Sequence, residues 1–210
     1  MTSMQVGPVA RRLQQVLGAH RVREWTDAQL LQQFVARREE DAFAALLRRH
    51  GPLVLGVCRR VLRREQDAED AFQATFLMLA RHAESIRETN SVGSWLYRVA
   101  HRIATKAGIA MARRNTLEKR VTPGANSAES PEHESSQAEL QAVLDNEVAR
   151  LPEKYRAPFV LCCLEGKTRT EAARELGWKE GTVGGRVALA RQMLQKRLTR
   201  RGVALTATLA

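Results

Sequence analysis

The feature that most constrains the fold is an apolar pattern with helical spacing, which runs from about Thr26 to Arg120. A capping box of Thr26 and Gln29 precedes the first apolar stripe. Two later stripes follow the i, i+3, i+4, i+7 spacing of one helix face, namely Val54, Val57, Cys58, Val61 and Leu62, then Ala68, Ala71, Phe72, Thr75 and Phe76. The pattern predicts a bundle of α-helices.

Two short segments are expected to separate these helices. They are Gly51–Pro52 and the polar run from Arg63 to Gln66. A further helix is predicted to begin near Gly93, with Leu96, Val99 and Ile103 on its buried side.

The composition changes after Val121. Residues 122–137 contain two prolines and four serines but no large apolar side chain, so this segment cannot bury enough surface to order itself. A helical stripe returns at Leu140, Leu144, Val148 and Leu151. The predicted fold class is all-α, with two small helical domains on a flexible acidic tether. The predicted boundaries are an extension at 1–24, a first domain at 25–120, a linker at 121–139, a second domain at 140–201 and a tail at 202–210.

Charge narrows the choice of partners. The chain has 34 Lys and Arg residues against 23 Asp and Glu residues, which gives a net charge of +11. Both predicted domains are basic and the linker is acidic, which indicates a polyanionic partner such as nucleic acid. No apolar run approaches the ~20 residues of a membrane span, and the N-terminus lacks the apolar core of an export signal. We therefore expect a cytoplasmic protein.

The three cysteines do not form a metal or redox motif. Cys58, Cys162 and Cys163 lie in apolar stripes and make no C-x-x-C pair. Packing in the hydrophobic core is their expected role.

The most specific local signal is a helix-turn-helix at Thr168–Leu198. Thr168 and Glu171 form a capping box, and Gly177 stands where the chain must turn with a positive φ. The inward side chains of the second helix are Val183, Val187, Ala190 and Leu194. This spacing is typical of motifs that place their second helix in the major groove of DNA.

The outward face of this motif is basic but carries few groups that read bases. The candidate DNA-binding residues are Thr168, Lys179, Thr182, Arg186 and Arg191. Gly184, Gly185, Ala188 and Leu189 cannot make bidentate hydrogen bonds to bases. An ordinary helical hairpin with a solvated basic face is the alternative interpretation.

An acidic helix is predicted at Asp67–Arg81. Asp67, Asp70 and Gln73 share an outer strip, whereas Phe72, Phe76 and Leu79 point inward. A hard cation needs three or more converging oxygen ligands, and no second acidic or histidine cluster follows nearby. The strip is either a docking surface for another protein or a solubilising face.

The helix after Gly93 carries a second basic stripe. Arg98, Arg102 and Lys106 repeat at i, i+4 and i+8, joined by His101 and later by Arg113 and Arg114. Such a stripe can follow a phosphate backbone, and Tyr97 beside it offers a ring for stacking. Trp95 borders the buried stripe, and a solvated basic face is again the alternative.

The joint order of these segments resembles the extracytoplasmic-function sigma factors of bacterial RNA polymerase. The resemblance rests on DAEDAFQATFLMLAR, SWLYRVAHRIA, the acidic linker, LPEKYRAPFVLCCLEGKT and EAARELGWKEGTVGGRVALAR, and it covers about residues 27–200. It implies a non-enzymatic initiation subunit without cofactor or metal. Its implied partners are core RNA polymerase, promoter DNA and, in many relatives, an inhibitory anti-sigma factor.

The resemblance also implies roles for individual residues. Core polymerase would be bound by Asp67, Asp70, Gln73 and Phe76. The melted minus-ten element would lie close to Trp95, Arg98, His101, Arg102 and Lys106. The duplex minus-thirty-five element would be contacted by Arg186 and Arg191. The acidic linker would thread toward the active-site channel of the polymerase.

The chain departs from the family pattern at a few positions. Gly184–Gly185 and Leu189 replace the usual basic or polar residues, and His101–Arg102 replaces the frequent Arg–Asn.

Two other functions compete with the sigma-factor hypothesis. One is a helix-turn-helix regulator that acts without polymerase, which the glycine pair argues against. The other is a carboxylate-metal nuclease built on Asp67, Glu69 and Asp70, which nothing in the spacing recommends.

Overall fold

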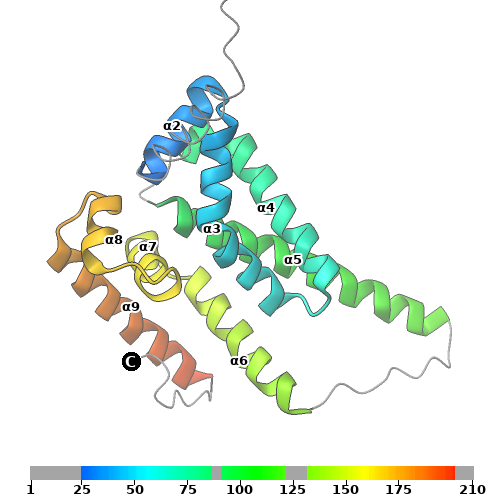
Figure 1. Cartoon of the computed structure of the whole chain (residues 1–210). Helices are drawn as coiled ribbons and strands as arrows, with labels where there is room; N and C mark the ends of the chain where they lie inside the picture. The colour runs from blue at the N-terminus through cyan, green and yellow to red at the C-terminus, as the bar shows by residue number, and fades with distance from the viewer. Residues whose placement is uncertain (1–24, 87–90, 122–131, 202–210) are drawn as a thin grey trace, which may run out of the picture.

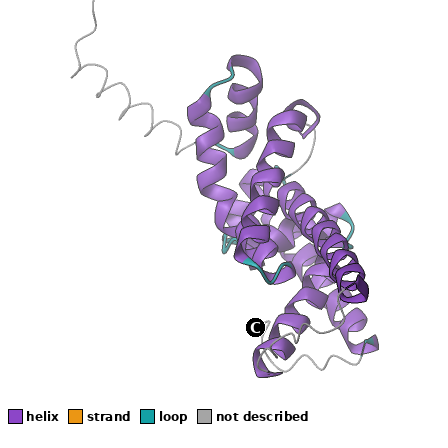
Figure 2. Cartoon of the chain, turned by 90° about the vertical axis from the view of Figure 1, so that its right-hand side faces the viewer, coloured by secondary structure: helices purple, strands orange, loops and turns teal. Residues whose placement is uncertain are grey.

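The computed structural model describes residues 25–86, 91–121 and 132–201. Within these ranges the chain is helical and contains no strand, as Figure 2 shows. The all-α prediction is confirmed. No helix in the described ranges has the length and apolar character needed to cross a bilayer.

The first part of the chain forms a bundle of four helices. They are α2 (Asp27–Arg37), α3 (Glu40–Val61), α4 (Glu65–Ile86) and α5 (Val92–Val121). The predicted capping box begins α2, because the Thr26 hydroxyl accepts from the Gln29 amide and the Gln29 side chain accepts from the Thr26 amide. Helix α3 packs against α2, α4 and α5, and therefore forms the centre of the bundle.

One of the two predicted helix breaks is wrong. Helix α3 continues through Gly51 and Pro52, although a proline inside a helix leaves one backbone hydrogen bond unmade. Gly51 is buried next to the ring of Phe72, and Val54 and Val57 beyond it are fully buried. Burial of this apolar face outweighs the local cost of the proline. The second predicted break is confirmed, since α3 ends at Val61 and α4 begins at Glu65.

The second part of the chain contains the predicted helix-turn-helix. Its elements are α6 (Glu132–Ala149), α7 (Glu153–Phe159), a π-helical turn η1 (Val160–Leu164), α8 (Arg169–Leu176) and α9 (Glu180–Arg200). The capping box of Thr168 and Glu171 begins α8. Gly177 ends α8 with φ of 66°, in the left-handed region that glycine adopts without strain. The four predicted inward residues of α9 are all buried.

The two predicted helical domains pack against each other in the structure. Figure 1 shows α6 to α9 along one side of the α2–α5 bundle, and helix α5 contacts α6, α7 and η1. A single hydrophobic cluster joins both parts, since it includes Leu46 and Leu96 as well as Phe159 and Leu194. Apolar patterning within each part did not reveal this shared core, because each stripe is also consistent with a separate domain.

The predicted linker is shorter than expected. Residues 132–139 belong to α6, and Val121 is the last residue of α5. The first turn of α6 carries Glu132 and Glu134, and helices favour acidic residues in their first turn. Residues 122–131, the N-terminal extension 1–24 and the tail 202–210 lie outside the described ranges.

Candidate functional site

A basic stripe runs along the exposed side of α5. Arg98, Arg102 and Lys106 are exposed, and Arg113 and Arg114 are exposed about two turns later. The buried residues Leu96, Ala100 and Ala104 hold the opposite side of the helix against the core. Because the three cations repeat every four residues, they share one face that can follow a row of phosphates.

A pocket of about 420 Å³ lies beside this stripe, between α4 and α5. Its apolar lining comes from Ala74, Leu77, Met78 and Ile103. The charged lining comes from Arg81, Arg102 and Lys106. An apolar floor with cations around it is suited to a flat ring attached to a phosphate chain, because the ring is desolvated while the phosphates are neutralised.

Three residues predicted near the single strand are less accessible than the stripe. Trp95 is half-buried and packs against the hydrophobic core. His101 is buried, and this burial lowers the pKa of its ring, so it does not extend the cationic stripe. Tyr97 has no exposed surface, and its hydroxyl donates to Oδ1 of Asp145 at 2.7 Å. The expectations of surface contact by His101 and of base stacking by Tyr97 are therefore wrong for this conformation.

The acidic strip of α4 is partly as predicted. Asp70 and Gln73 are exposed, whereas the Asp67 side chain is only 16% exposed and lies 3.9 Å from Arg64. Phe76 is buried, with its ring against those of Phe43 and Phe72, which excludes it from a docking surface in this structure.

The same side of α4 carries a large apolar side chain that the sequence patterns did not single out. Leu77 is 59% exposed and stands one turn beyond Gln73. Asp70, Gln73 and Leu77 thus form a mixed acidic and apolar ridge, which we name the α4 ridge. Exposed apolar groups rimmed by polar ones are typical of protein interfaces.

The outward face of the helix-turn-helix is exposed but carries few extended cations. Lys179 and Thr182 are exposed at the start of α9, whereas the Thr168 hydroxyl is used in the cap of α8. The guanidinium of Arg186 stacks on the ring of Trp178, 4.0 Å from its centroid. Arg191 is exposed and lies near Sγ of Cys163, at 3.8 Å.

The glycine pair of α9 leaves this face open. A Cβ at Gly185 would meet no atom within 4 Å. A Cβ at Gly184 would lie 3.6 Å from Nη1 of Arg169, an exposed arginine in the first turn of α8. Arg169, which the sequence analysis did not select, therefore places its guanidinium across the glycine segment.

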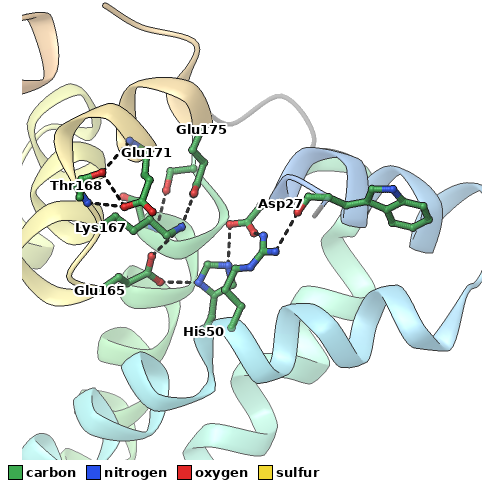
Figure 3. Close-up of polar contacts among 11 residues, drawn as sticks. Asp27, His50, Glu165, Lys167, Thr168, Glu171 and Glu175 are labelled. Carbon is green, nitrogen blue, oxygen red and sulfur yellow. Dashed lines mark hydrogen bonds and ion pairs between the residues drawn. The ribbon is translucent and has the colours of Figure 1, made fainter. Parts of the chain in front are cut away.

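A buried polar cluster joins the two parts of the chain. The His50 ring has no exposed surface, and it lies 2.8 Å from Oδ2 of Asp27 and 2.6 Å from Oε1 of Glu165. Lys167 pairs with Glu165 at 3.4 Å and with Glu175. Figure 3 shows these side chains converging from the first bundle, from the segment that leads into α8 and, for Glu175, from α8 itself. We name Asp27, His50, Glu165, Lys167 and Glu175 the junction cluster.

The charges in the junction cluster depend on one another. Burial alone would lower the pKa of His50, but the carboxylates of Asp27 and Glu165 raise it to about 9. Burial also raises the pKa of Glu175 to about 7, and nearby Asp27 and Glu165 add to that effect against the opposing Lys167. His50 is therefore a cation at neutral pH, with both ring N–H groups donating.

A second group of polar contacts fixes α6 and α7 to the first bundle. Arg60 donates to both carboxylate oxygens of Asp145, at 2.6 and 3.1 Å, and Tyr97 donates to the same carboxylate. Arg156 donates to the Ser94 hydroxyl at 3.2 Å. These contacts and the junction cluster depend on residues far apart in the sequence, so short-range motifs gave no signal for them.

The remaining expectations concern metals and cysteines. Within the described ranges, no group of three or more Asp, Glu, His or Cys side chains is arranged to hold a metal ion. Cys58 is buried, and Cys162 and Cys163 are half-buried beside the core. All three thiols are free, in agreement with the expected packing role.

Comparison with known proteins identifies the family. The model of Sigma-70 region 2 matches residues 46–114, and that of Sigma-70 region 4 matches residues 141–194. The ECF RNA polymerase sigma factor SigM of Mycobacterium tuberculosis is 34% identical over 175 residues, which span 83% of this chain and 86% of that protein. The chain belongs to the extracytoplasmic-function sigma factors.

A second relative agrees with this assignment. The ECF RNA polymerase sigma-E factor of Haemophilus influenzae is 28% identical over 182 residues, covering 82% of this sigma factor and 95% of that one. Among solved structures, CnrH in complex with the cytosolic domain of CnrY matches 83% of this chain and 97% of that chain, with 21% identity and a TM-score of 0.40. The two matched regions correspond to the α3–α5 and α6–α9 parts of the sigma factor.

Proposed function

We propose that this sigma factor binds core RNA polymerase through the α4 ridge and the melted minus-ten strand through the basic stripe of α5. The helix-turn-helix of α8 and α9 would bind the duplex minus-thirty-five element. The observation that carries the proposal is the position of the stripe beside the pocket between α4 and α5. The sigma factor acts as a binding subunit of the initiation complex rather than as an enzyme.

The α5 surface is suited to an unpaired strand. Arg102 and Lys106 line the pocket and also belong to the exposed stripe, so phosphate contacts and an apolar recess lie next to each other. Phosphate contacts alone bind duplex and single strand alike and therefore do not open DNA. A base held in the recess gains stacking or apolar contact of about 1–3 kcal/mol, which the closed duplex does not offer. Melting becomes favourable when such contacts offset the lost base stacking.

The α4 ridge is suited to a protein partner. Asp70 and Gln73 offer polar groups, and Leu77 offers an apolar side chain that is more than half exposed. The ridge belongs to the helix that also contributes to the pocket, so a partner on it would lie close to the strand. Asp67 would contribute at the edge of this contact through its charge, whereas the buried Phe76 would support the ridge from beneath.

The second domain is proposed to bind duplex DNA mainly through contacts to the sugar-phosphate backbone of the DNA. Lys179, Thr182 and Arg191 are exposed around the glycine segment of α9. Arg186 reaches the same face but is stacked on Trp178. Two weak sites on one chain bind a common promoter well, because the second contact becomes intramolecular.

Two further parts of the proposal concern organisation and regulation. We assign residues 25–121 to the polymerase- and minus-ten-binding domain and residues 132–201 to the minus-thirty-five-binding domain.

An anti-sigma factor is proposed as the inhibitory partner, on the strength of family membership. The α4 ridge and the pocket beside it are candidate surfaces for such an inhibitor, because it would compete there with polymerase.

The proposal is tested by assembly with core polymerase. Asp70→Arg reverses the charge of the ridge without entering the core, and it is expected to lower core binding at least tenfold in a co-elution or fluorescence titration. Glu40→Arg, at an exposed position on α3, is the matched control and should bind core like the wild type. A wild-type chain that fails to bind core at low salt would reject the proposal.

A further inference from the structure

The glycine segment of α9 is crossed by the side chain of an arginine from the preceding helix. Arg169 is the first residue of α8 after its cap, and its side chain is exposed. A Cβ at Gly184 would lie 3.6 Å from Nη1, 3.7 Å from Cδ and 3.8 Å from Cζ of Arg169. The guanidinium therefore lies against α9 beside Gly184, in the space that a longer side chain at that position would occupy.

The Arg169 guanidinium has no partner within the part of the chain that the structure describes, where it makes no hydrogen bond or ion pair. Neighbouring polar groups are engaged. The Thr170 hydroxyl donates to Oε2 of Glu180 at 3.1 Å, which joins the first turns of α8 and α9, and Arg186 is stacked on Trp178. The N–H donors of Arg169 are therefore available to a partner outside the chain.

The position of Arg169 in its helix also indicates a role other than stability. The N-terminal end of a helix carries partial positive charge, so a cation in the first turn is disfavoured there. Glu171, in the same turn, has the favourable sign and forms the capping box with Thr168. Helix α8 thus gains nothing from the charge of Arg169, which is suited instead to an anionic or electron-rich partner.

The surface of α9 next to Arg169 has no long polar side chain. Gly185 is exposed, and an added Cβ there would meet no atom within 4 Å. Ala188 and Leu189 are exposed one turn later. A major groove that receives this part of α9 can approach the helix backbone closely, because no side chain at 184 or 185 holds the bases away. The Arg169 guanidinium then enters the groove together with α9.

We propose that Arg169 is the residue with which the helix-turn-helix reads a base of the minus-thirty-five duplex, and that this base is a guanine. A guanidinium presents two parallel N–H donors, which match O6 and N7 of guanine in the major groove. Gly184 and Gly185 give the side chain its access to the base edges. The inference rests on the proposed contact of α8 and α9 with duplex DNA, and it adds base recognition to that contact.

Selection of duplexes, followed by replacement of single atoms, tests the proposal. Holoenzyme assembled from core polymerase and the full chain would be incubated with duplex oligonucleotides that contain a randomised segment, and the bound duplexes would be sequenced. We expect the wild type to enrich a sequence that contains guanine. Each enriched guanine would then be replaced in turn by 7-deazaguanine, which lacks the N7 acceptor. One of these replacements should weaken binding about tenfold.

Substitutions of Arg169 assign this effect to one side chain. Arg169→Ala should bind the enriched duplex about tenfold more weakly than the wild type and should no longer distinguish guanine from 7-deazaguanine. Arg169→Lys keeps the charge but not the planar pair of donors, so it should keep the wild-type salt dependence and lose the same discrimination.

The matched control is Arg174→Ala, which removes another exposed arginine of α8 from a different face of the helix. It should bind and discriminate like the wild type. Because Arg169 is exposed and unpartnered, thermal unfolding of its two variants should match that of the wild type.

The possible results separate this inference from the proposed function. Arg169→Ala that still responds to 7-deazaguanine overturns the inference, as does Arg169→Lys with wild-type discrimination, since charge alone would then suffice. An enriched sequence in which no 7-deazaguanine replacement weakens binding also overturns it. A wild-type holoenzyme that enriches no sequence rejects the proposed duplex contact of the second domain, and the inference with it.

Discussion

Nδ1 of His50 donates to Oε1 of Glu165 at 2.6 Å, across the boundary between the two sigma regions and 115 residues apart in the chain. The same ring donates through Nε2 to Asp27, so a single side chain connects α2, α3 and the segment before α8. The stability of the packed molecule therefore depends on the charge of one histidine.

This dependence predicts that the chain loses stability as the pH rises through the neutral range. The pKa of His50 is about 9 in the folded chain and 6.5 as its ordinary value. A raised pKa contributes stability that is complete below pH 6.5 and is lost between pH 6.5 and pH 9. The free energy of unfolding should fall by up to about 3 kcal/mol over this range, measured by urea titration. His50→Gln should remove most of the difference between pH 6.5 and pH 9, and an unchanged slope in that variant would contradict the assignment.

Asp145 is predicted to matter more for stability than its partner Tyr97. The Asp145 carboxylate is buried and accepts from both Arg60 and Tyr97, so Asp145→Ala leaves a half-buried arginine and a buried hydroxyl without this partner. Breaking a buried charged pair costs about 3–5 kcal/mol, whereas Tyr97→Phe should cost about 1 kcal/mol. The free energies of unfolding of the two variants are compared by urea titration. Equal losses of stability would show that the Asp145 carboxylate is not the centre of these contacts.

The helical elements could be predicted from sequence because their signals are local. The capping boxes at Thr26 and Thr168 and the left-handed turn at Gly177 involve residues within one helical turn of each other, and all three were found as predicted. Pro52 misled the prediction because the gain from burying Val54 and Val57 is a tertiary effect. Helical periodicity in α4 and α5 separated the exposed Asp70, Arg98 and Arg102 from the core. It also placed Phe76 inward, and only the family resemblance suggested Phe76 as a polymerase contact. His101 was grouped with the basic stripe, although it is buried.

The contacts between the domains were beyond sequence reasoning for a different reason. His50 interrupts an apolar stripe and reads as an isolated polar residue, and its partners Asp27 and Glu165 lie 23 and 115 residues away. A single sequence contains no local signal that places residues so far apart in contact. Similarly, the aromatic ring of Tyr97 suggested a residue that stacks on a base. Only the folded structure shows that Tyr97 is buried and donates a hydrogen bond to Asp145.

The glycines of the helix-turn-helix predict two opposite stability changes. Gly185 lies inside α9 and its added Cβ would meet nothing within 4 Å, so Gly185→Ala should stabilise the fold by about 0.5–1 kcal/mol. Gly177 has φ of 66°, so Gly177→Ala should destabilise it by about 1 kcal/mol, although its Cβ would also meet open space. The two substitutions add the same methyl group, and thermal unfolding of both separates backbone strain from packing. Two changes of the same sign would contradict this account.

The basic stripe of α5 predicts the salt dependence of single-strand binding. Each phosphate contact on a single strand contributes about 0.7 to the slope of log affinity against log salt. Arg102→Ala combined with Lys106→Ala should therefore reduce the slope for oligothymidylate by about 1.4, while duplex binding by α8 and α9 keeps its slope. Arg63→Ala combined with Arg200→Ala removes two exposed cations away from the stripe and should leave the single-strand slope unchanged. An equal fall in both double variants would mean that overall charge, rather than this face of α5, binds the strand.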